Sequence, residues 1–145
     1  MKIKELLKAK GPEVFTIGSE KNLYDAMRTM VNNHIGVLLV LSSEGRIEGI
    51  ISERDIIRTG FNNPEGFLSE TVNSVMTKSV IIVEPDDDIE YAEHIMTQNR
   101  IRHLPVVHNK VLVGLISVGD VIKAILTDTR HDNKYLLEYI SGGTK

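Results

Sequence analysis

The chain has 145 residues, 41% hydrophobic and 26% charged, a balance typical of one soluble globular domain. It contains no Cys, which excludes disulfides and thiolate metal sites, and its net charge of −3 with only 5% aromatic residues argues against a general nucleic-acid binder. No apolar stretch approaches the roughly 20 residues of a membrane span, and the first residues lack the apolar core of a signal peptide. We therefore expect a cytoplasmic protein.

The first half of the chain predicts a short amphipathic segment, then a strand, a helix, two strands and a second helix. Apolar residues at helical spacing mark the first helix, and a continuous apolar run marks a strand that is covered on both faces. These elements are residues 1–13, Val14–Ile17, about Leu23–Asn32, Ile35–Leu41, Ile47–Ser52 and a helix starting near Glu53.

Residues 60–71 have the composition of a linker, and after a helical turn at about Val72–Met76 the pattern starts again. The offset is 66 residues up to the hairpin turn and 65 after it, because the second turn is one residue shorter. The repeated elements are strands at Val80–Val83, Ile101–Val107 and Leu112–Ser117 and a helix from about Ile89. The segment from Asp120 to about Ile140 predicts two helices or one interrupted helix. We take the duplication as established.

A motif shared by both halves carries the duplication most clearly. Gly49-Ile50-Ile51-Ser52-Glu53-Arg54-Asp55 recurs as Gly114-Leu115-Ile116-Ser117-Val118-Gly119-Asp120. Each copy indicates a strand that turns into a helix, with Ser at the N-cap and Asp in the first turn. One such arrangement is ordinary helix capping, whereas two in one register favour a further role.

These motifs, with the strand Arg102-His103-Leu104-Pro105-Val106 and the segment Val75-Met76-Thr77, resemble those of the tandem cystathionine-β-synthase-type (CBS) domain pair, or Bateman module. The resemblance spans about residues 8–140 and is greatest to small stand-alone bacterial or archaeal CBS-pair proteins. It implies an α/β (α+β) fold of two β-α-β-β-α repeats packed with pseudo-two-fold symmetry. The expected divisions are a first repeat at 8–62, a second at 72–128, and terminal segments at 1–7 and 129–145.

The resemblance also implies a regulatory module that is not an enzyme and that binds an adenosine compound. The expected ligands are AMP, ADP, ATP, NAD(H) or S-adenosylmethionine, held in two clefts between the repeats. The module would act through the shape of a homodimer or through an unidentified partner protein. No metal, membrane or nucleic acid is expected as a ligand.

The motif residues suit a nucleotide. An ionised carboxylate accepts from both ribose hydroxyls at once, which assigns Asp55 and Asp120 to the ribose. Ser52 and Ser117 lie at helix N-termini, which favour an anion, so they are assigned to phosphate or ribose. The cationic candidates for phosphate are Arg54, Arg100, Arg102, His103 and Lys123. The expected adenine pocket comprises Thr16, Ile17, Val37, Ile82 and Val83. The two clefts are unlike, because Ile82 replaces Thr16 and Gly119 replaces Arg54 in the second repeat.

Two other functions stay open. The chain could be a ligand-free dimerisation scaffold in which both motifs only cap helices. A nucleotide hydrolase is disfavoured, since no nucleophile–base pair or paired catalytic carboxylates emerge. The run Asp86-Asp87-Asp88 precedes a helix, so its charge is better explained by the helix dipole than by a metal.

Overall fold

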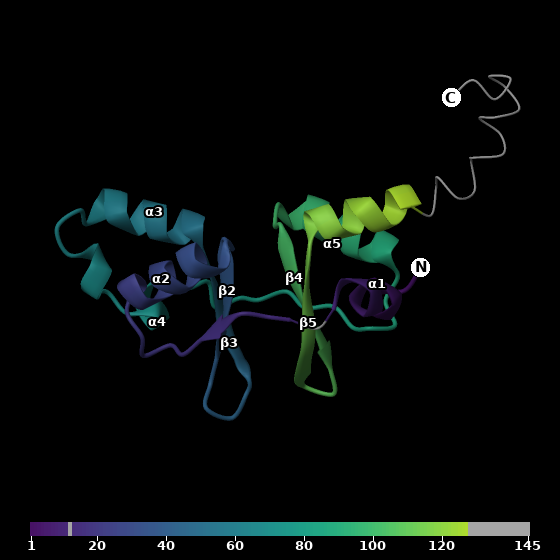
Figure 1. Cartoon of the computed structure of the whole chain (residues 1–145), viewed down its shortest axis with the longest axis horizontal. Coiled ribbons are helices and arrows are strands. Elements are labelled where there is room, and N and C mark those ends of the chain that lie inside the picture. The colour runs from purple at the N-terminus through teal and green to yellow at the C-terminus, as the bar shows by residue number, and fades with distance from the viewer. Residues whose placement is uncertain (12, 128–145) are drawn as a thin grey trace, which may run out of the picture. The chain divides into compact units, whose positions relative to one another are not determined.

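The computed structural model describes residues 1–11 and 13–127, and its mixed helices and strands confirm the α+β class (Figure 1). The elements are α1 (Ile3–Lys10), β1 (Thr16–Ile17), α2 (Leu23–Asn33), β2 (Val37–Leu41), β3 (Ile47–Ser52), α3 (Glu53–Asn62), the 3-10 helix η1 (Phe67–Ser69), α4 (Val72–Val75), α5 (Ile89–Asn99), β4 (His103–His108) and β5 (Val111–Ser117). Residues 118–127 form a further helix. No helix within the described ranges is long and apolar enough to cross a bilayer.

Spatial contacts divide the chain into two compact units. Among the described residues, the repeat-1 unit consists mainly of Glu13–Ile81, and the repeat-2 unit consists of residues 1–11, Ile82–His108 and residues 113–127. The N-terminal segment thus packs with the second repeat. The expected first repeat began at residue 8, so it included Lys8–Lys10, which the spatial contacts group with the second repeat. The predicted end of the last segment, at Leu136–Ile140, lies outside the described residues.

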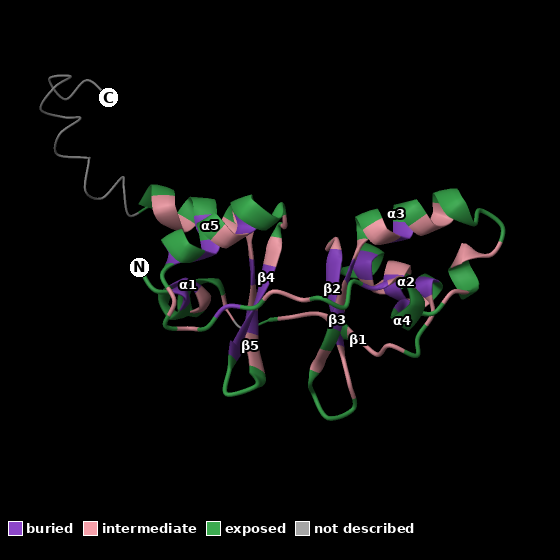
Figure 2. Cartoon of the chain, turned by 180° about the vertical axis from the view of Figure 1, so that it is seen from behind, coloured by how far each residue is buried: buried purple, intermediate pink, exposed green. Residues whose placement is uncertain are grey.

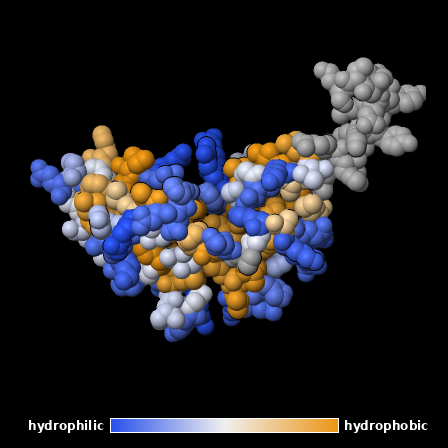
Figure 3. Space-filling view, in the orientation of Figure 1, coloured by the Kyte–Doolittle hydropathy of each residue, from blue (hydrophilic) through white to orange (hydrophobic). Residues whose placement is uncertain are grey.

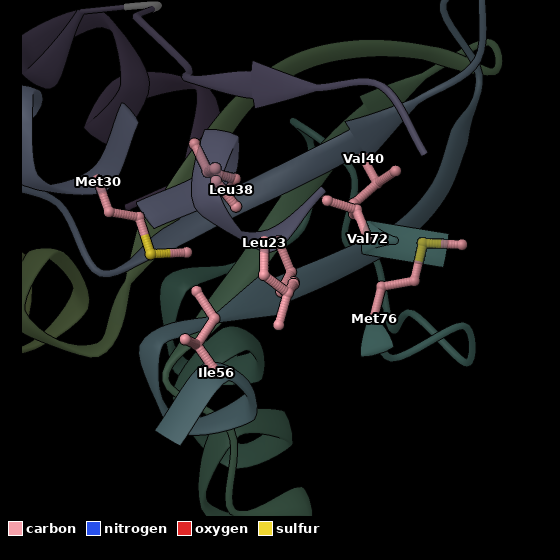
Figure 4. Packing of buried hydrophobic residues seen from close by; sticks show 9 residues of the cluster. Leu23, Met30, Leu38, Val40, Ile56, Val72 and Met76 are labelled. Atoms are coloured by element: carbon pink, nitrogen blue, oxygen red, sulfur yellow. The ribbon is translucent and has the colours of Figure 1, made fainter. Parts of the chain in front are cut away.

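The core of the repeat-1 unit lies between one face of a three-stranded sheet and its helices. The sheet has the order β1-β2-β3, with β1 parallel and β3 antiparallel to β2. Helices α2 and α3 lie on one side of it (Figure 1). Their apolar side chains meet those of alternate strand residues, as Figure 4 shows at close range. The buried cluster comprises Leu23, Ala26, Met30, Leu38, Val40, Ile51, Ile56, Val72 and Met76.

The repeat-2 unit buries the equivalent residues around strands β4 and β5. Ile89 is buried like Leu23, 66 positions earlier, and Ile116 is buried like Ile51, 65 positions earlier. Five more core positions match in the same way: Ala92, Met96, Leu104, Val106 and Val121. Figure 2 shows the buried strands and the exposed outer faces of the helices in each repeat. The duplication in the sequence is therefore a duplication of the core.

Each unit is completed by the short helix that precedes the other repeat in the sequence. In the repeat-2 unit, the N–H of Ile3 in α1 donates to the carbonyl of Asp87 at 2.9 Å. In the repeat-1 unit, the N–H of Val72 in α4 donates to the equivalent carbonyl, that of Lys21, at 2.8 Å. The two helices differ in length, because α1 has eight residues and α4 has four. This difference changes what lies beside each Ser-x-x-Asp motif.

The strand predicted at Val80–Val83 is wrong, and Pro105 explains why. In the repeat-1 unit, the N–H of Leu39 donates to the carbonyl of Phe15 at 3.2 Å and helps to pair β1 with β2. Pro105 stands at the position equivalent to Leu39 and has no N–H, so the corresponding bond cannot form. What remains is a single parallel bridge between Val83 and Val106.

Several other predicted boundaries differ, among them the starts of β2 and β4, which each lie two residues later than expected. Strand β1 covers only Thr16–Ile17, although Phe15 still accepts the bond just described. Helix α3 continues through Gly60 to Asn62, into the segment predicted as linker. The shorter hairpin turn consists of Asn109 and Lys110, both with positive φ, as a two-residue hairpin of this kind requires.

Candidate functional site: the two Ser-x-x-Asp helix starts

The first Ser-x-x-Asp motif begins helix α3. Asp55 Oδ2 accepts hydrogen bonds from the Ser52 N–H at 2.9 Å and the Ser52 hydroxyl at 3.1 Å, and Ser52 Oγ accepts from the Asp55 N–H at 3.2 Å. Arg58, one turn later, lies 3.7 Å from the other carboxylate oxygen, Oδ1. The predicted capping role of this motif is confirmed. Arg54 lies exposed at the surface.

The second motif forms the same cap with one additional donor. Asp120 Oδ2 accepts from the Ser117 N–H at 2.8 Å, and Ser117 Oγ accepts from the Asp120 N–H at 3.1 Å. The Nζ of Lys10, in the last turn of α1, donates to the same Oδ2 at 2.6 Å and to the carbonyl of Leu115 at 2.6 Å. The side chains of Lys10 and Asp120 are 33% and 26% exposed, so this ion pair is partly shielded from water.

The charges around the second motif shift two pKa values. Burial opposes ionisation of Asp120, but the hydrogen bonds from Lys10 and Ser117 outweigh it, so the pKa of Asp120 lies below its usual value. Burial also lowers the pKa of His103, with further lowering by Lys10 and Arg102 against an opposing effect of Asp120. The imidazole is therefore neutral and the carboxylate ionised at pH 7.

Both motifs lie at the end of a sheet face that points away from the helices. Strand residues alternate between faces, so the burial of Leu38 and Ile51 among the helices puts Val37 and Ser52 on the opposite face. Val37 and Ser52 are partners in the β2–β3 ladder. In the repeat-2 unit His103 takes the place of Val37. The structure thus brings together Val37, Ser52 and Asp55 in one unit.

The second unit brings together the corresponding predicted residues. The N–H of Val118 donates to the carbonyl of Arg102 at 2.8 Å, which fixes Arg102 and His103 beside the start of helix 118–127. The Arg102 side chain is exposed, and His103 is half-buried. Lys123 is exposed on helix 118–127, and Arg100 ends α5 in the left-handed conformation.

The residues predicted to form the adenine pocket do not share one pocket in the structure. Thr16 and Ile17 line a groove of about 490 Å³ in the repeat-1 unit, together with residues of α2 such as Asp25 and Arg28. Neither Val37 nor any residue of the first motif lines this groove. In the repeat-2 unit, Ile82 is 46% exposed and Val83 is buried.

The three consecutive aspartates before α5 are engaged by other groups. Asp86 and Asp88 pair with Lys4 at 2.9 Å and Lys2 at 3.0 Å, and Asp87 accepts from the Glu84 N–H at 2.8 Å. Asp88 occupies the N-cap position without a capping hydrogen bond from its side chain. Within the described part of the chain, no three His, Asp or Glu residues are grouped as metal ligands.

Sequence reasoning missed Lys10. Its position in a preceding helix gave no sign that it would contact the second motif, 110 residues later. The basic last turn of α1, with Lys8 and Lys10, was the only available signal, and it is an ordinary feature of a helix C-terminus.

Comparison with known proteins identifies a family whose sequence pattern matches this chain twice. A model described as the CBS domain matches residues 3–61 and again residues 72–127. The mitochondrial CBS domain-containing protein CBSX3 of Arabidopsis thaliana is 32% identical, with coverage of 97% of this chain and 72% of that protein. The crystal structure of a CBS-domain containing protein from Agrobacterium tumefaciens has a TM-score of 0.82 and 35% identity, with coverage of 85% of this chain and 92% of the other.

Two similar structures contain adenosine compounds, at an identity that supports the fold alone. CBSX2 in complex with AMP has a TM-score of 0.75 and 21% identity, covering 89% of this chain and 98% of the other. The CBS domain pair of protein MJ0100, in complex with 5′-methylthioadenosine and S-adenosyl-L-methionine, has a TM-score of 0.77 and 21% identity. The match covers 88% of this chain and 98% of the other.

Proposed function

The chain belongs to the CBS-domain family, with two copies of the domain in tandem, and on that premise we propose that it is a regulatory module that binds adenine nucleotides. Asp55 and Asp120 would hold the ribose, and Ser52 and Ser117 would lie next to the ribose or phosphate. The module has no catalytic role in this proposal. The ligand alters a homodimer or the activity of a partner protein.

One observation carries the proposal: each capping carboxylate uses a single oxygen, Oδ2, for its hydrogen bonds within the described residues. The other oxygen of Asp55, Oδ1, lies 3.7 Å from the Arg58 guanidinium, too far for a hydrogen bond. The corresponding Oδ1 of Asp120 accepts no hydrogen bond from a described residue. Helix capping alone does not require the same Ser-x-x-Asp motif at the equivalent position of both repeats. Two carboxylates with an acceptor to spare, each at a helix N-terminus, suit a ribose linked to an anion.

The structural complexes support the choice of ligand class. CBSX2 binds AMP, and the MJ0100 domain pair binds 5′-methylthioadenosine and S-adenosyl-L-methionine. An adenosine moiety is common to these compounds. We accordingly propose AMP, ADP, ATP, NAD(H) or S-adenosylmethionine as ligands of this chain, in a cytoplasmic setting.

A ligand-free scaffold is the second candidate, and the complete capping boxes at both motifs favour it. Thermal melting with AMP, ATP, NADH and S-adenosylmethionine separates the two functions. A ligand at about 100 times its dissociation constant stabilises the folded state by roughly 2.7 kcal/mol, or a rise of several degrees in melting temperature. A rise with at least one compound supports the nucleotide module, whereas no rise with any of them supports the scaffold.

The proposed homodimer rests on apolar side chains that are exposed at equivalent positions of the two repeats. Ile57 and Phe61 on α3 are 71% and 85% exposed, and Ile122 and Leu126, 65 positions later, are 50% and 52% exposed. Each pair lies four residues apart, on one face of its helix. Figure 3 shows hydrophobic surface over α3 and over helix 118–127. A second copy of the chain, which presents the same residues, is the partner we propose.

A further inference from the structure

Lys10 makes the surroundings of the second motif unlike those of the first. In the repeat-1 unit, the chain after α4 pairs its Thr77 backbone with Ile50, through bonds of 2.9 and 3.0 Å. In the repeat-2 unit, α1 continues for another turn, and the Lys10 ammonium reaches the carbonyl of Leu115, which is equivalent to that of Ile50. The longer helix therefore replaces a neutral backbone contact with a positive charge.

The hydrogen-bonding capacity of Asp120 determines what a ribose must displace. Each carboxylate oxygen accepts about two hydrogen bonds, and Oδ2 already accepts from the Ser117 N–H and from Lys10. A ribose that engages both carboxylate oxygens therefore competes for Oδ2. The Ser117 N–H belongs to the helix cap and stays, so the ligand displaces Lys10.

Displacement leaves the Lys10 ammonium without a counter-ion in a partly shielded place. Arg102 adds a second positive charge nearby, and the neutral His103 adds none. A phosphate on the incoming ligand would replace the lost carboxylate as partner of Lys10. Adenosine and 5′-methylthioadenosine offer no such anion, and S-adenosylmethionine carries a net positive charge at neutral pH, because its sulfonium and ammonium outnumber its single carboxylate.

We propose that Lys10 makes the second motif selective for phosphorylated adenosine compounds over neutral or cationic ones. The proposal rests on the nucleotide-binding function proposed above and narrows its ligand class. The first motif lacks this selectivity, because the cation beside Asp55 is the exposed Arg58, which lies 3.7 Å from Oδ1 and makes no bond to the capping oxygen Oδ2.

Calorimetric titration of AMP, adenosine and S-adenosylmethionine tests the proposal. An Asp55→Asn background silences the first motif, and the Asn oxygen still accepts the cap bond from Ser52. In this background Lys10→Gln should weaken AMP about tenfold or more and leave adenosine unchanged or tighter, because only AMP uses the charge. Lys10→Arg should retain the preference for AMP, which distinguishes charge from loss of folding. Lys8→Gln, an exposed site on the same helix, is the matched control and should change neither affinity.

Several results would overturn the inference. Equal losses of AMP and adenosine in Lys10→Gln would mean that Lys10 acts only on structure, and an unchanged ratio would mean that its charge is irrelevant. AMP binding to the wild-type protein that disappears entirely with Asp55→Asn would leave the proposed function intact and sink this inference alone. Failure of the wild-type protein to bind any of the three compounds would remove both.

Discussion

The glycines that open the two motifs provide a sharp test of the fold, because they face different neighbours. A Cβ added to Gly49 would lie 2.6 Å from the Met76 sulfur and 2.8 Å from the backbone oxygen of Thr77. A Cβ on Gly114 would lie 2.7 Å from a terminal methyl of Leu7, with no backbone atom among its nearest contacts. Alanine at Gly49 thus pushes against backbone, and alanine at Gly114 pushes against a side chain that can rotate.

The magnitudes follow from these contacts. Overpacking costs about 1–3 kcal/mol, and weakening the two Ile50–Thr77 hydrogen bonds adds up to about 1 kcal/mol for each. Replacing Gly by Ala restricts the unfolded chain and returns about 0.4–1 kcal/mol. We expect Gly49→Ala to cost about 2–3 kcal/mol in the free energy of unfolding, and Gly114→Ala about 1 kcal/mol or less.

Urea denaturation and thermal melting of the two variants measure the difference. At this chain length 1 kcal/mol corresponds to roughly 3 °C in melting temperature, so Gly49→Ala should melt about 6–9 °C below the wild type and Gly114→Ala no more than about 3 °C below it. Equal losses, or a larger loss at Gly114, would refute the argument from backbone contact.

Three further predictions concern the caps, the pH dependence and the dimer. Ser52→Ala and Ser117→Ala should each lower the stability by about 1 kcal/mol in chemical denaturation, and an unchanged midpoint would contradict the capping role. The pKa of His103 is lowered by burial, so the unfolded state binds a proton before the folded state does as the pH falls below about 6.5, and the stability should decline there. His103→Gln should flatten the dependence of stability on pH between about pH 7 and 5. An unaltered slope would contradict the lowered pKa of His103. The double variant Ile57→Ser/Phe61→Ser should sediment as a monomer under conditions in which the wild type is a dimer, and a persistent dimer would place the interface elsewhere.

Much of the fold was predictable because core positions repeat. The spacing of Leu23, Ala26 and Met30 identified α2, and the same spacing 66 residues later identified α5. Strand Ile47–Ser52 and the start of α3 were placed correctly, since the Ser-x-x-Asp cap is a local signal that needs no tertiary information.

The errors came from interactions that local patterns do not report. Residues Val80–Val83 have a strand-like composition, but their partner strand contains Pro105, and the missing N–H is visible only once the register is known. Gly60 suggested a linker, yet α3 continues through it, and the Phe67 ring packs so close that a Cβ on Gly60 would lie 3.4 Å from it. No prediction was made for the packing of helix α1 as a whole, and its place with the second repeat depends on contacts far apart in the sequence.

The candidate site was predictable in its motif residues and not in their surroundings. Ser52, Asp55, Ser117 and Asp120 could be found because they recur in one register. The ion pair of Asp120 with Lys10 could not be found, since it joins two segments with no shared pattern. The sequence therefore predicted that the two sites differ through Arg54 and Gly119, and it missed the positive charge that Lys10 adds beside the second motif.

The most direct test of the account is a calorimetric titration of AMP into the wild-type protein and into the double variant Asp55→Asn/Asp120→Asn. Asn preserves the cap acceptor and removes the charge that would hold the ribose hydroxyls. We predict that the wild type binds AMP and that the double variant binds it about 10- to 100-fold more weakly with its fold intact by circular dichroism. Equal affinity of the two proteins for AMP would contradict the claim that these carboxylates bind the ligand.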